Sequence, residues 1–397
     1  MPHARAETSR AAVHLAARMA DIEPFHVMEI QRRAFEMDAA GRHVVHMEIG
    51  QPDFAAPAPV IEAAIAAMRR EPMGYAPSLG LPALRAAIAR FYAERYGVEI
   101  GMERVLVTAG ASGAFLIALG ALVDPGDEVL MPDPCYPCNR HFVRLFGGEA
   151  RCIPVDERSG YQLTRAEIER GWGARTRGVL LASPSNPTGT IIGAPELSAI
   201  MDWVHARGGF VLVDEIYHEL VYGDPQPSAA ALSDDVFVVN SFSKYFNMTG
   251  WRLGWIVAPA RYGRALERLA QNLYICASVP AQHAAIAALA PAALAIFEER
   301  RREFQRRRDF LVPALRELGF RVPLTPEGAF YVYAGCEAFD EDSHALALRL
   351  LERAGVAITP GIDFGVHRPE HHVRFAYTRA LEELREGVER MRAELVR

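Results

Sequence analysis

Short apolar runs alternate with segments of helical pattern through the middle of this 397-residue chain. Each run is rich in branched side chains and has the length of a buried strand. The runs lie at residues 105–107, 128–131, 179–181, 210–213, 236–239 and 253–257. Because such alternation is typical of strands joined by helical crossovers, it predicts an α/β fold in which helices cover both faces of a mostly parallel sheet.

The pattern changes near Pro291. Residues 296–318 form a helical stretch rich in arginine and glutamate, which Pro313 is expected to kink or break. Short strands are expected around residues 329–333 and 373–377, with a helix over residues 344–354 between them. This mixed order of helices and strands predicts a second, smaller α+β domain.

The N-terminal segment is expected to pack with the smaller domain, since a helix-like stretch at residues 30–40 precedes a strand at residues 44–49. The predicted organisation is an N-terminal segment over residues 1–48, a large α/β domain over residues 49–290 and a small α+β domain over residues 291–397. A cleft between the two domains would be a natural substrate site.

The composition favours a soluble cytoplasmic protein. A formal net charge of −6 gives no reason to expect nucleic acid or a membrane surface as a partner. No apolar run reaches the roughly 20 residues that span a bilayer. Residues 1–21 mix arginine with acidic side chains and lack the apolar stretch of a signal peptide.

The cysteines and histidines give little reason to expect a metal or a disulfide. Five cysteines are an odd number in a large chain, which argues against a disulfide framework. Cys135 and Cys138 have C-x-x-C spacing, but a zinc site needs about four ligands and the sequence has no second pair. A polar loop explains the histidines at positions 367, 371 and 372. We therefore expect reduced thiols and no metal site.

Lys244 is the only lysine among 43 basic residues. Arginine stays protonated in proteins and cannot form an imine, whereas a lysine amine can lose its proton and attack a carbonyl or an aldehyde cofactor. Lys244 is therefore a candidate Schiff-base residue, although a surviving surface lysine would explain it equally well without context. The run at residues 236–239 places it just past the C-terminal end of a buried strand, where open α/β sheets bind ligands.

Residues 241–252 supply that context. They contain the pattern S-x-S-K and a later G-x-R, whose arginine lies eight residues beyond Lys244. This segment resembles the cofactor-lysine segment of class I and II aminotransferases, which are fold type I pyridoxal-phosphate (PLP) enzymes. The resemblance covers residues 24–379, with seven motif segments in the family's order. It implies PLP anchored at Lys244, and a large domain with a mostly parallel, seven-stranded type of sheet beside a smaller α+β domain.

Two segments fit PLP by their own chemistry. Gly110, Ala111 and Ser112 open a helix after a strand, where small residues let backbone amides approach a phosphate, although a plain strand-to-helix loop explains them equally well. Asp214 ends a run that looks fully buried, and a buried aspartate is costly unless a cation pairs with it. A pyridinium nitrogen is such a cation, and the pair would keep the ring an electron sink.

The resemblance implies the remaining cofactor contacts. It implies that Tyr136 stacks on the ring and that Asn186 and Tyr217 reach the ring oxygen. It also implies that Ser241 and Arg252 bind the phosphate, the arginine as a planar fork. For any single arginine in this chain a solvated surface charge is the bland alternative, and the family-like segment around Arg252 is what favours the binding role.

The resemblance also implies substrate contacts and a partner subunit. Arg374 matches the arginine that binds the substrate α-carboxylate, with Asn186 and the backbone of Gly50 beside it. Tyr75 matches a tyrosine that crosses the dimer interface to the partner's cofactor phosphate. A homodimer is therefore implied.

The implied reaction is a ping-pong transfer of the amino group of an L-amino acid to a 2-oxo acid. Lys244 would act as general base once it is displaced from the cofactor, with Asp214 and Tyr217 as the other catalytic residues. Some aspartate-specific members carry a lysine at the position of Ser112 to bind the side-chain carboxylate of the substrate, and a serine cannot take that role. Residues 24–27, in the segment that lines the side-chain pocket of relatives, look apolar. We therefore expect a neutral, aliphatic or aromatic amino donor.

Three other functions remain open at this point. Another arginine, from this chain or a partner, could recognise a dicarboxylate, as in an aspartate-type aminotransferase. The same residues serve PLP-dependent β-elimination in a C–S lyase, which releases pyruvate and ammonia. A PLP-fold binding protein without turnover is the third, but the segment before Pro24 is too short for a helix-turn-helix domain plus linker. The set of Lys244, Asp214 and Arg374 also argues for turnover.

Overall fold

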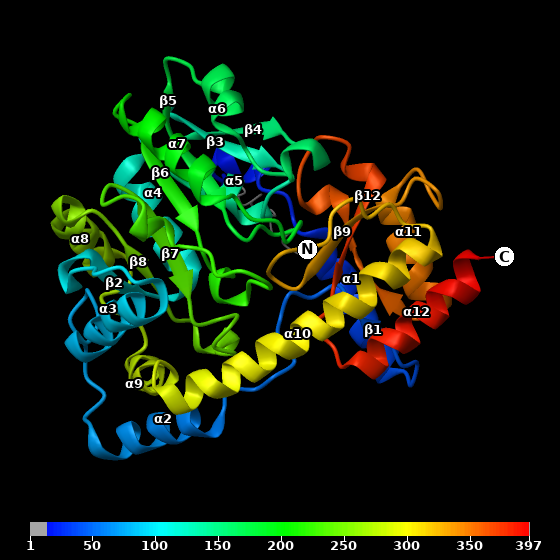
Figure 1. Ribbon diagram of the computed structural model, residues 1–397, viewed down its shortest axis with the longest axis horizontal. Coiled ribbons are helices and arrows are strands. Elements are labelled where there is room, and N and C mark those ends of the chain that lie inside the picture. Colours follow the sequence, from blue (N-terminus) through cyan, green and yellow to red (C-terminus); the bar gives the residue numbers. More distant parts are fainter. Residues whose placement is uncertain (1–13, 397) are drawn as a thin grey trace, which may run out of the picture.

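The computed structural model describes residues 14–396 (Figure 1). Residues 1–13 lie outside the described residues. They make up much of the N-terminal segment for which no signal peptide is expected. A seven-stranded sheet has the order β2-β8-β7-β6-β5-β3-β4. Its strands are β2 (Val105–Thr108), β3 (Glu128–Asp133), β4 (Glu149–Pro154), β5 (Thr176–Ala182), β6 (Phe210–Asp214), β7 (Phe237–Ser241) and β8 (Gly254–Val257). Only β8 runs antiparallel to its neighbours, so the expected mostly parallel sheet is confirmed.

Side chains along the strands alternate between two cores on opposite faces of this sheet. On β5, Val179 and Leu181 belong to one buried cluster and Leu180 belongs to the other. One face is covered by α3 (Pro82–Tyr96), α6 (Arg165–Gly171) and α7 (Ala194–His205), and the other by α4 (Gly110–Leu122), α5 (Pro137–Leu145) and α8 (Gly263–Leu273). Because both faces are covered, the inner strands are continuous apolar runs, which is why the sequence reveals them.

Strand β4 is the strand of this sheet that the apolar runs do not reveal. It lies at the edge and pairs in parallel with β3. Its side chains are exposed or half-buried and include Glu149 and Arg151. An edge strand with one partner and little burial needs no apolar run, so its sequence resembles a loop.

A second group of elements brings the C-terminal part of the chain together with the N-terminal segment. It contains an antiparallel sheet of β9 (Tyr331–Gly335), β12 (His372–Ala376) and β11 (Thr359–Pro360), a parallel pair of β1 (Val45–His46) and β10 (Val356–Ala357), and the helices α1 (His26–Ala39), α11 (Ser343–Arg349) and α12 (Leu381–Leu395) (Figure 1). The strand expected over residues 44–49 is thus only two residues long. The domain boundaries at residues 48 and 290 stay a prediction.

Helix α10 (Pro291–Leu318) crosses the molecule toward the C-terminal elements (yellow in Figure 1). It has 28 residues and continues through Pro313, so the break expected at that proline does not occur. Leu311 and Leu315 are buried on either side of the proline, and this packing holds both parts of the helix. The helix expected over residues 344–354 is α11 followed by a π-helical turn, Leu350–Ala354.

The remaining helices are α2 (Ala58–Arg70) and α9 (Val279–Ala288). Within residues 14–396, no single helix has the length and apolar character needed to cross a membrane. Helices α9 and α10 meet that criterion only when taken together, and they are bent by 79° at the break between them.

The loops with the candidate residues leave the large sheet at the edge formed by the ends of its strands, not along the edge strand β4. Strands β2, β5, β6 and β7 share one direction, so their C-terminal ends lie at this edge, and the antiparallel β8 begins there. Helix α4 consequently starts at Gly110 just after β2, Asp214 ends β6, and Lys244 follows β7. Where β8 meets α4 there is no room for a side chain, because a Cβ on Gly254 would lie 2.9 Å from the backbone nitrogen of Ala111.

Gly254→Ala should destabilise the protein, because the added methyl group would overlap backbone atoms of Asn240 and Ala111. We expect the free energy of unfolding to fall by about 1–3 kcal/mol. Gly250→Ala is the matched control, since a Cβ there would meet no atom within 4 Å. Chemical denaturation measures both variants, and equal unfolding midpoints would contradict this account of β8.

Candidate active site

A cavity of about 280 Å³ lies at this edge of the large sheet, and β12 and the N-terminal segment complete its wall. Most residues singled out from the sequence line it: Gly50, Ala111, Ser112, Tyr136, Asn186, Asp214, Tyr217, Lys244, Arg252 and Arg374. Gly110, Ser241 and Tyr75 do not line it. The fold therefore gathers residues from distant parts of the chain around a single space.

Lys244 lies three residues beyond β7, and its amine donates a hydrogen bond of 2.6 Å to the carbonyl oxygen of Gly50. Burial lowers the pKa of Lys244 to about 8, and the positive charges of Arg374 and Arg252 act in the same direction. An appreciable fraction of the amine is therefore neutral near neutral pH, as a nucleophile or a general base requires.

Asp214 is the last residue of β6, with only 6% of its surface exposed. Its Oδ1 accepts a 3.0 Å hydrogen bond from the backbone N–H of Ile216. Burial raises the pKa of Asp214 to about 7, even though this hydrogen bond and the charge of Lys244 both lower it. A carboxyl group in this position would release its proton readily if a further cation came beside it.

An anion-binding corner forms where α4 begins. Gly110 has a positive φ of 72°, and a Cβ there would lie 2.7 Å from Nη2 of Arg252. Arg252 is itself in the left-handed region, with φ 52°, and it donates to the carbonyl oxygen of Thr249 at 3.0 Å. The N-terminal amides of α4 and the guanidinium group of Arg252 thus face one space, where both favour an anion.

The two serines before Lys244 differ in position. Ser241 is buried, and its hydroxyl lies 3.0 Å from the carbonyl oxygen of Leu253 and 2.9 Å from the hydroxyl of Ser243. Ser243 lines the cavity, with its hydroxyl 3.5 Å from Nη1 of Arg252. The pattern S-x-S-K contains both serines, and strand geometry alone does not say which of them faces a ligand.

Arg374 in β12 is buried and held by neutral oxygen atoms. Its Nη1 donates to Asn186 Oδ1 at 2.9 Å, and its Nη2 donates to the carbonyl oxygen of Glu48 at 2.6 Å and to Thr359 Oγ1 at 3.1 Å. Among the residues that the structure describes, its Nε has no hydrogen-bond partner. The arrangement leaves a buried, positively charged donor group beside Asn186 for a carboxylate ligand.

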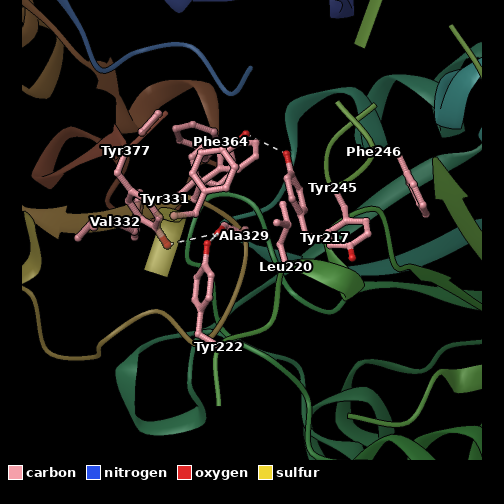
Figure 2. Packing of buried hydrophobic residues seen from close by; sticks show 14 of the residues in the cluster. Tyr217, Leu220, Tyr222, Tyr245, Phe246, Ala329, Tyr331, Val332, Phe364 and Tyr377 are labelled. Atoms are coloured by element: carbon pink, nitrogen blue, oxygen red, sulfur yellow. Dashed lines mark hydrogen bonds between the residues drawn. The ribbon is translucent and has the colours of Figure 1, made fainter. Parts of the chain in front are cut away.

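Tyrosine side chains form another part of the wall. Burial raises the pKa of Tyr136 and of Tyr217 well above the usual range of a phenol. The hydroxyl of Tyr217 lies 2.8 Å from that of Tyr331. Figure 2 shows the two side chains facing each other. Tyr331 was not singled out from the sequence, because strand periodicity places Tyr331 and Tyr333 on the same face of β9 and does not distinguish them.

The N-terminal segment contributes Phe25, Val27 and Met28 to the lining. Asp363 fixes the start of α1, because its two carboxylate oxygens accept hydrogen bonds from the backbone N–H groups of His26, at 2.8 Å, and Val27, at 2.9 Å. Asp363 also lines the cavity and was missed in the sequence, where no pattern links an aspartate to a helix so far away along the chain.

Tyr75 lies away from this cavity, between α2 and α3, and 84% of its surface is exposed. Its expected role concerns the cofactor of a partner subunit, and a single chain does not test that role.

The arrangement fits PLP, the cofactor implied by the sequence. The partly buried amine of Lys244, with its lowered pKa, could bond the aldehyde carbon, and the buried carboxyl group of Asp214 could face the ring nitrogen. The corner at Gly110 and Arg252 could hold the phosphate. Each task of the cofactor site thus has a side chain or a backbone group facing the same cavity.

Comparisons with known proteins agree with this fit. The model of the family "Aminotransferase class I and II" matches residues 42–391. The chain is 41% identical to a Mycobacterium tuberculosis protein named valine–pyruvate aminotransferase, over 94% of this chain and 96% of that protein. It is 35% identical to a Streptomyces avermitilis protein named aspartate aminotransferase, over 95% of each. A crystal structure of an aminotransferase from Mycobacterium tuberculosis superimposes with a TM-score of 0.93 at 40% identity, covering 97% of this chain and 99% of that one.

The family match, the two relatives and the superposition each cover most of the chain, and the residues around the cavity suit the cofactor. The chain therefore belongs to the class I and II aminotransferases and is a PLP-dependent transaminase.

Proposed function

We propose that this transaminase moves the amino group of a neutral L-amino acid to a 2-oxo acid in a ping-pong reaction, with Lys244 as the residue that anchors the cofactor and transfers the proton. The observation that supports this most strongly is the partly buried amine of Lys244, which faces the cavity with its pKa lowered to about 8. When bound, the cofactor supplies an electron sink that makes the α-proton of the substrate acidic.

The cofactor would be held by groups on different elements. Asp214 would pair with the protonated ring nitrogen, and Tyr136 would stack on the ring. Asn186 and Tyr217 would reach the ring oxygen. Arg252 would bind the phosphate together with the amides and hydroxyl at the start of α4, residues Gly110, Ala111 and Ser112, and with Ser243, whose position supports it over Ser241.

Lys244 would move the proton. Once released from the cofactor, its neutral amine would take the proton from the α-carbon of the substrate. It would then return the proton to the cofactor carbon that is bonded to the transferred nitrogen. The hydrogen bond from Lys244 to the Gly50 carbonyl supports this, because it holds the amine beside the backbone proposed to receive the substrate carboxylate.

The substrate would be recognised at two places. Arg374 and Asn186 would bind the α-carboxylate. The side chain of the substrate would lie against Phe25, Val27 and Met28, and these apolar residues support a neutral aliphatic or aromatic donor. The relative named valine–pyruvate aminotransferase supports the same choice, whereas the relative named aspartate aminotransferase keeps a dicarboxylate substrate as the second candidate.

We also propose that the enzyme works as a cytoplasmic homodimer. The exposure of Tyr75 supports a role in a partner's site, and exposed apolar side chains at Ile61, Met68, Leu273 and Ile275 are available for an interface. Five free cysteines fit a reducing compartment. A mass in solution equal to that of one chain, measured by light scattering with PLP present, would contradict the dimer.

Lys244→Ala should severely slow the first half-reaction. The wild-type protein should show the absorption band of lysine-bound PLP, and an amino donor without any oxo acid should convert it to that of pyridoxamine phosphate. The variant should lack the lysine-bound band, and its conversion should be slower by at least about a hundredfold. Lys244→Arg is the matched control, because it keeps the positive charge but loses the reactive amine. It should therefore lose the band and the activity as Lys244→Ala does.

Three results would contradict the proposed reaction. A protein that cannot be loaded with PLP would remove the basis for the cofactor site. Accumulation of pyruvate and ammonia from cysteine-type substrates, with the band unchanged, would favour a C–S lyase. A loaded protein that converts no donor at all would favour a binding protein.

Ser112→Lys should shift the donor preference toward aspartate. Ser112 lines the cavity, so a lysine there would place a cation within reach of a side-chain carboxylate. We expect kcat/KM for aspartate to rise by about tenfold and kcat/KM for valine to fall, with Ser112→Met as a neutral control of similar length. A wild-type enzyme that already prefers aspartate over valine would contradict the proposed donor class.

Asp214→Asn should stabilise the cofactor-free protein but weaken PLP binding. The pKa of Asp214 is raised by burial from 3.8 to about 7, so the folded state loses stability as the pH rises through this window, and the loss is complete above it. At pH 8 the variant should therefore be more stable by about 2–4 kcal/mol, and the difference should vanish toward pH 4. Its dissociation constant for PLP should rise about tenfold or more, because an amide cannot pair with a ring cation.

Thermal unfolding across this pH range and a PLP titration measure the two effects of Asp214→Asn. The exposed Asp202 on α7 provides a control, Asp202→Asn. If Asp214→Asn were less stable than the wild type at pH 8 without PLP, the carboxylate would have another partner in the folded protein and the argument would be wrong.

A further inference from the structure

Tyr331 occupies the point where the proposed cofactor contacts and the proposed substrate contacts meet. It lies at the start of β9 and is 1% exposed. Its hydroxyl is 2.8 Å from the hydroxyl of Tyr217, and the two rings are in an edge-on arrangement (Figure 2). The guanidinium carbon of Arg374 lies 4.3 Å from the centre of its ring.

The hydroxyl of Tyr331 also lies close to the backbone of Gly50. A Cβ on Gly50 would lie 1.8 Å from this oxygen, so the chain can pass here only as glycine. The carbonyl oxygen of the same glycine accepts the hydrogen bond of Lys244. One phenol therefore contacts three parts of the site, which come from different regions of the sequence.

In the hydrogen bond between the two phenols, the geometry alone allows either hydroxyl to be the donor. Burial raises the pKa of both phenols, and the charge of Arg374 opposes the rise at both. The other ionisable groups near this pair are Tyr136 and the amine of Lys244, which lies 5.7 Å from the ring centre of Tyr217. Each phenol has one proton, so when Tyr217 gives its proton to a cofactor oxygen, Tyr331 is the donor in the bond between the two hydroxyls.

We propose that Tyr331 is a positioning residue: its hydroxyl donates to Tyr217, which leaves the single proton of Tyr217 free for the cofactor's ring oxygen, and its ring holds Arg374 in place for the substrate carboxylate. This inference rests on the function proposed above. A phenol has one proton, so without Tyr331 the hydroxyl of Tyr217 would be free to turn toward other acceptors.

The hydroxyl of Tyr331 then has a consequence for the loaded enzyme that can be measured without turnover. A hydrogen bond donated to the negative ring oxygen weakens the attraction of that oxygen for the neighbouring proton, which lies on the nitrogen that links Lys244 to the cofactor. The proton is therefore lost at lower pH. Tyr331→Phe should weaken this chain of hydrogen bonds and move the pH midpoint of the cofactor's absorption band upward by about 0.3–1 unit.

The ring of Tyr331 has a separate consequence for substrate binding. A cation over an aromatic face in a desolvated site is stabilised, and Tyr331→Phe keeps that face, whereas Tyr331→Leu removes it. We expect Tyr331→Phe to keep KM for the amino acid and the oxo acid within about twofold, and Tyr331→Leu to raise both by about three- to tenfold. Tyr331→Met is a second variant without the ring, in case Tyr331→Leu does not fold.

Tyr333→Phe is the matched control, because Tyr333 is two residues along the same strand and its ring stacks on His372. It should leave both the midpoint and KM unchanged. A purely structural role of Tyr331 would lower the melting temperature of its variants without the split between midpoint and KM.

Two results would overturn the inference while leaving the proposed function intact. The first is a Tyr331→Phe enzyme that binds PLP and transaminates with the midpoint of the wild type, which would remove the role of the hydroxyl. The second is a folded Tyr331→Leu or Tyr331→Met enzyme with the KM values of the wild type, which would remove the role of the ring. By contrast, a wild-type protein without a lysine-bound PLP band would overturn the proposed function itself.

Discussion

Positive charge at the wall of one cavity is the constraint on which this site depends. Lys244, Arg252 and Arg374 face one cavity, which the carboxyl groups of Asp214, Glu48 and Asp363 also line. In the part of the chain that the structure describes, Arg374 is held by amide, hydroxyl and carbonyl oxygens, and Arg252 donates to a carbonyl oxygen and lies near a serine hydroxyl. Neutral oxygens fix the position of a guanidinium group without neutralising it. The two guanidinium groups therefore keep their positive charge for anions, and a phosphate and a carboxylate are the two that the reaction requires.

The fold supplies this constraint by bringing together segments that are far apart in sequence. The loop that begins at Gly50 is held at Asp53, whose carboxylate accepts a 2.9 Å hydrogen bond from the buried Arg307 on α10. Arg307 also donates to Glu303 one turn earlier on the same helix. Helix α10 thus links the elements around α2 and α9 to the loop that receives the amine of Lys244 (Figure 1).

The sequence predicts those parts of the molecule in which local composition and position agree. The inner strands are apolar because both faces are covered, and Asp214 and Lys244 stand at strand ends, so the sequence alone is enough to place the site at one edge of the sheet. Strand β4 was missed, because an edge strand needs little apolar surface. Pro313 did not break α10, because tertiary packing on both sides outweighs the local cost of proline. Tyr331 and Asp363 act through contacts with residues far away in sequence, and no local pattern carries that information.

The presence of a single lysine in the sequence has a practical consequence for protein chemistry. The chain offers only one peptide bond to a protease that cuts after lysine, between Lys244 and Tyr245, and digestion of the denatured chain would give fragments of residues 1–244 and 245–397. Reduction of the loaded enzyme with borohydride would make the link to the cofactor permanent and block that single cut. The ratio of intact to cleaved chain would then report directly the fraction of molecules that carry the cofactor.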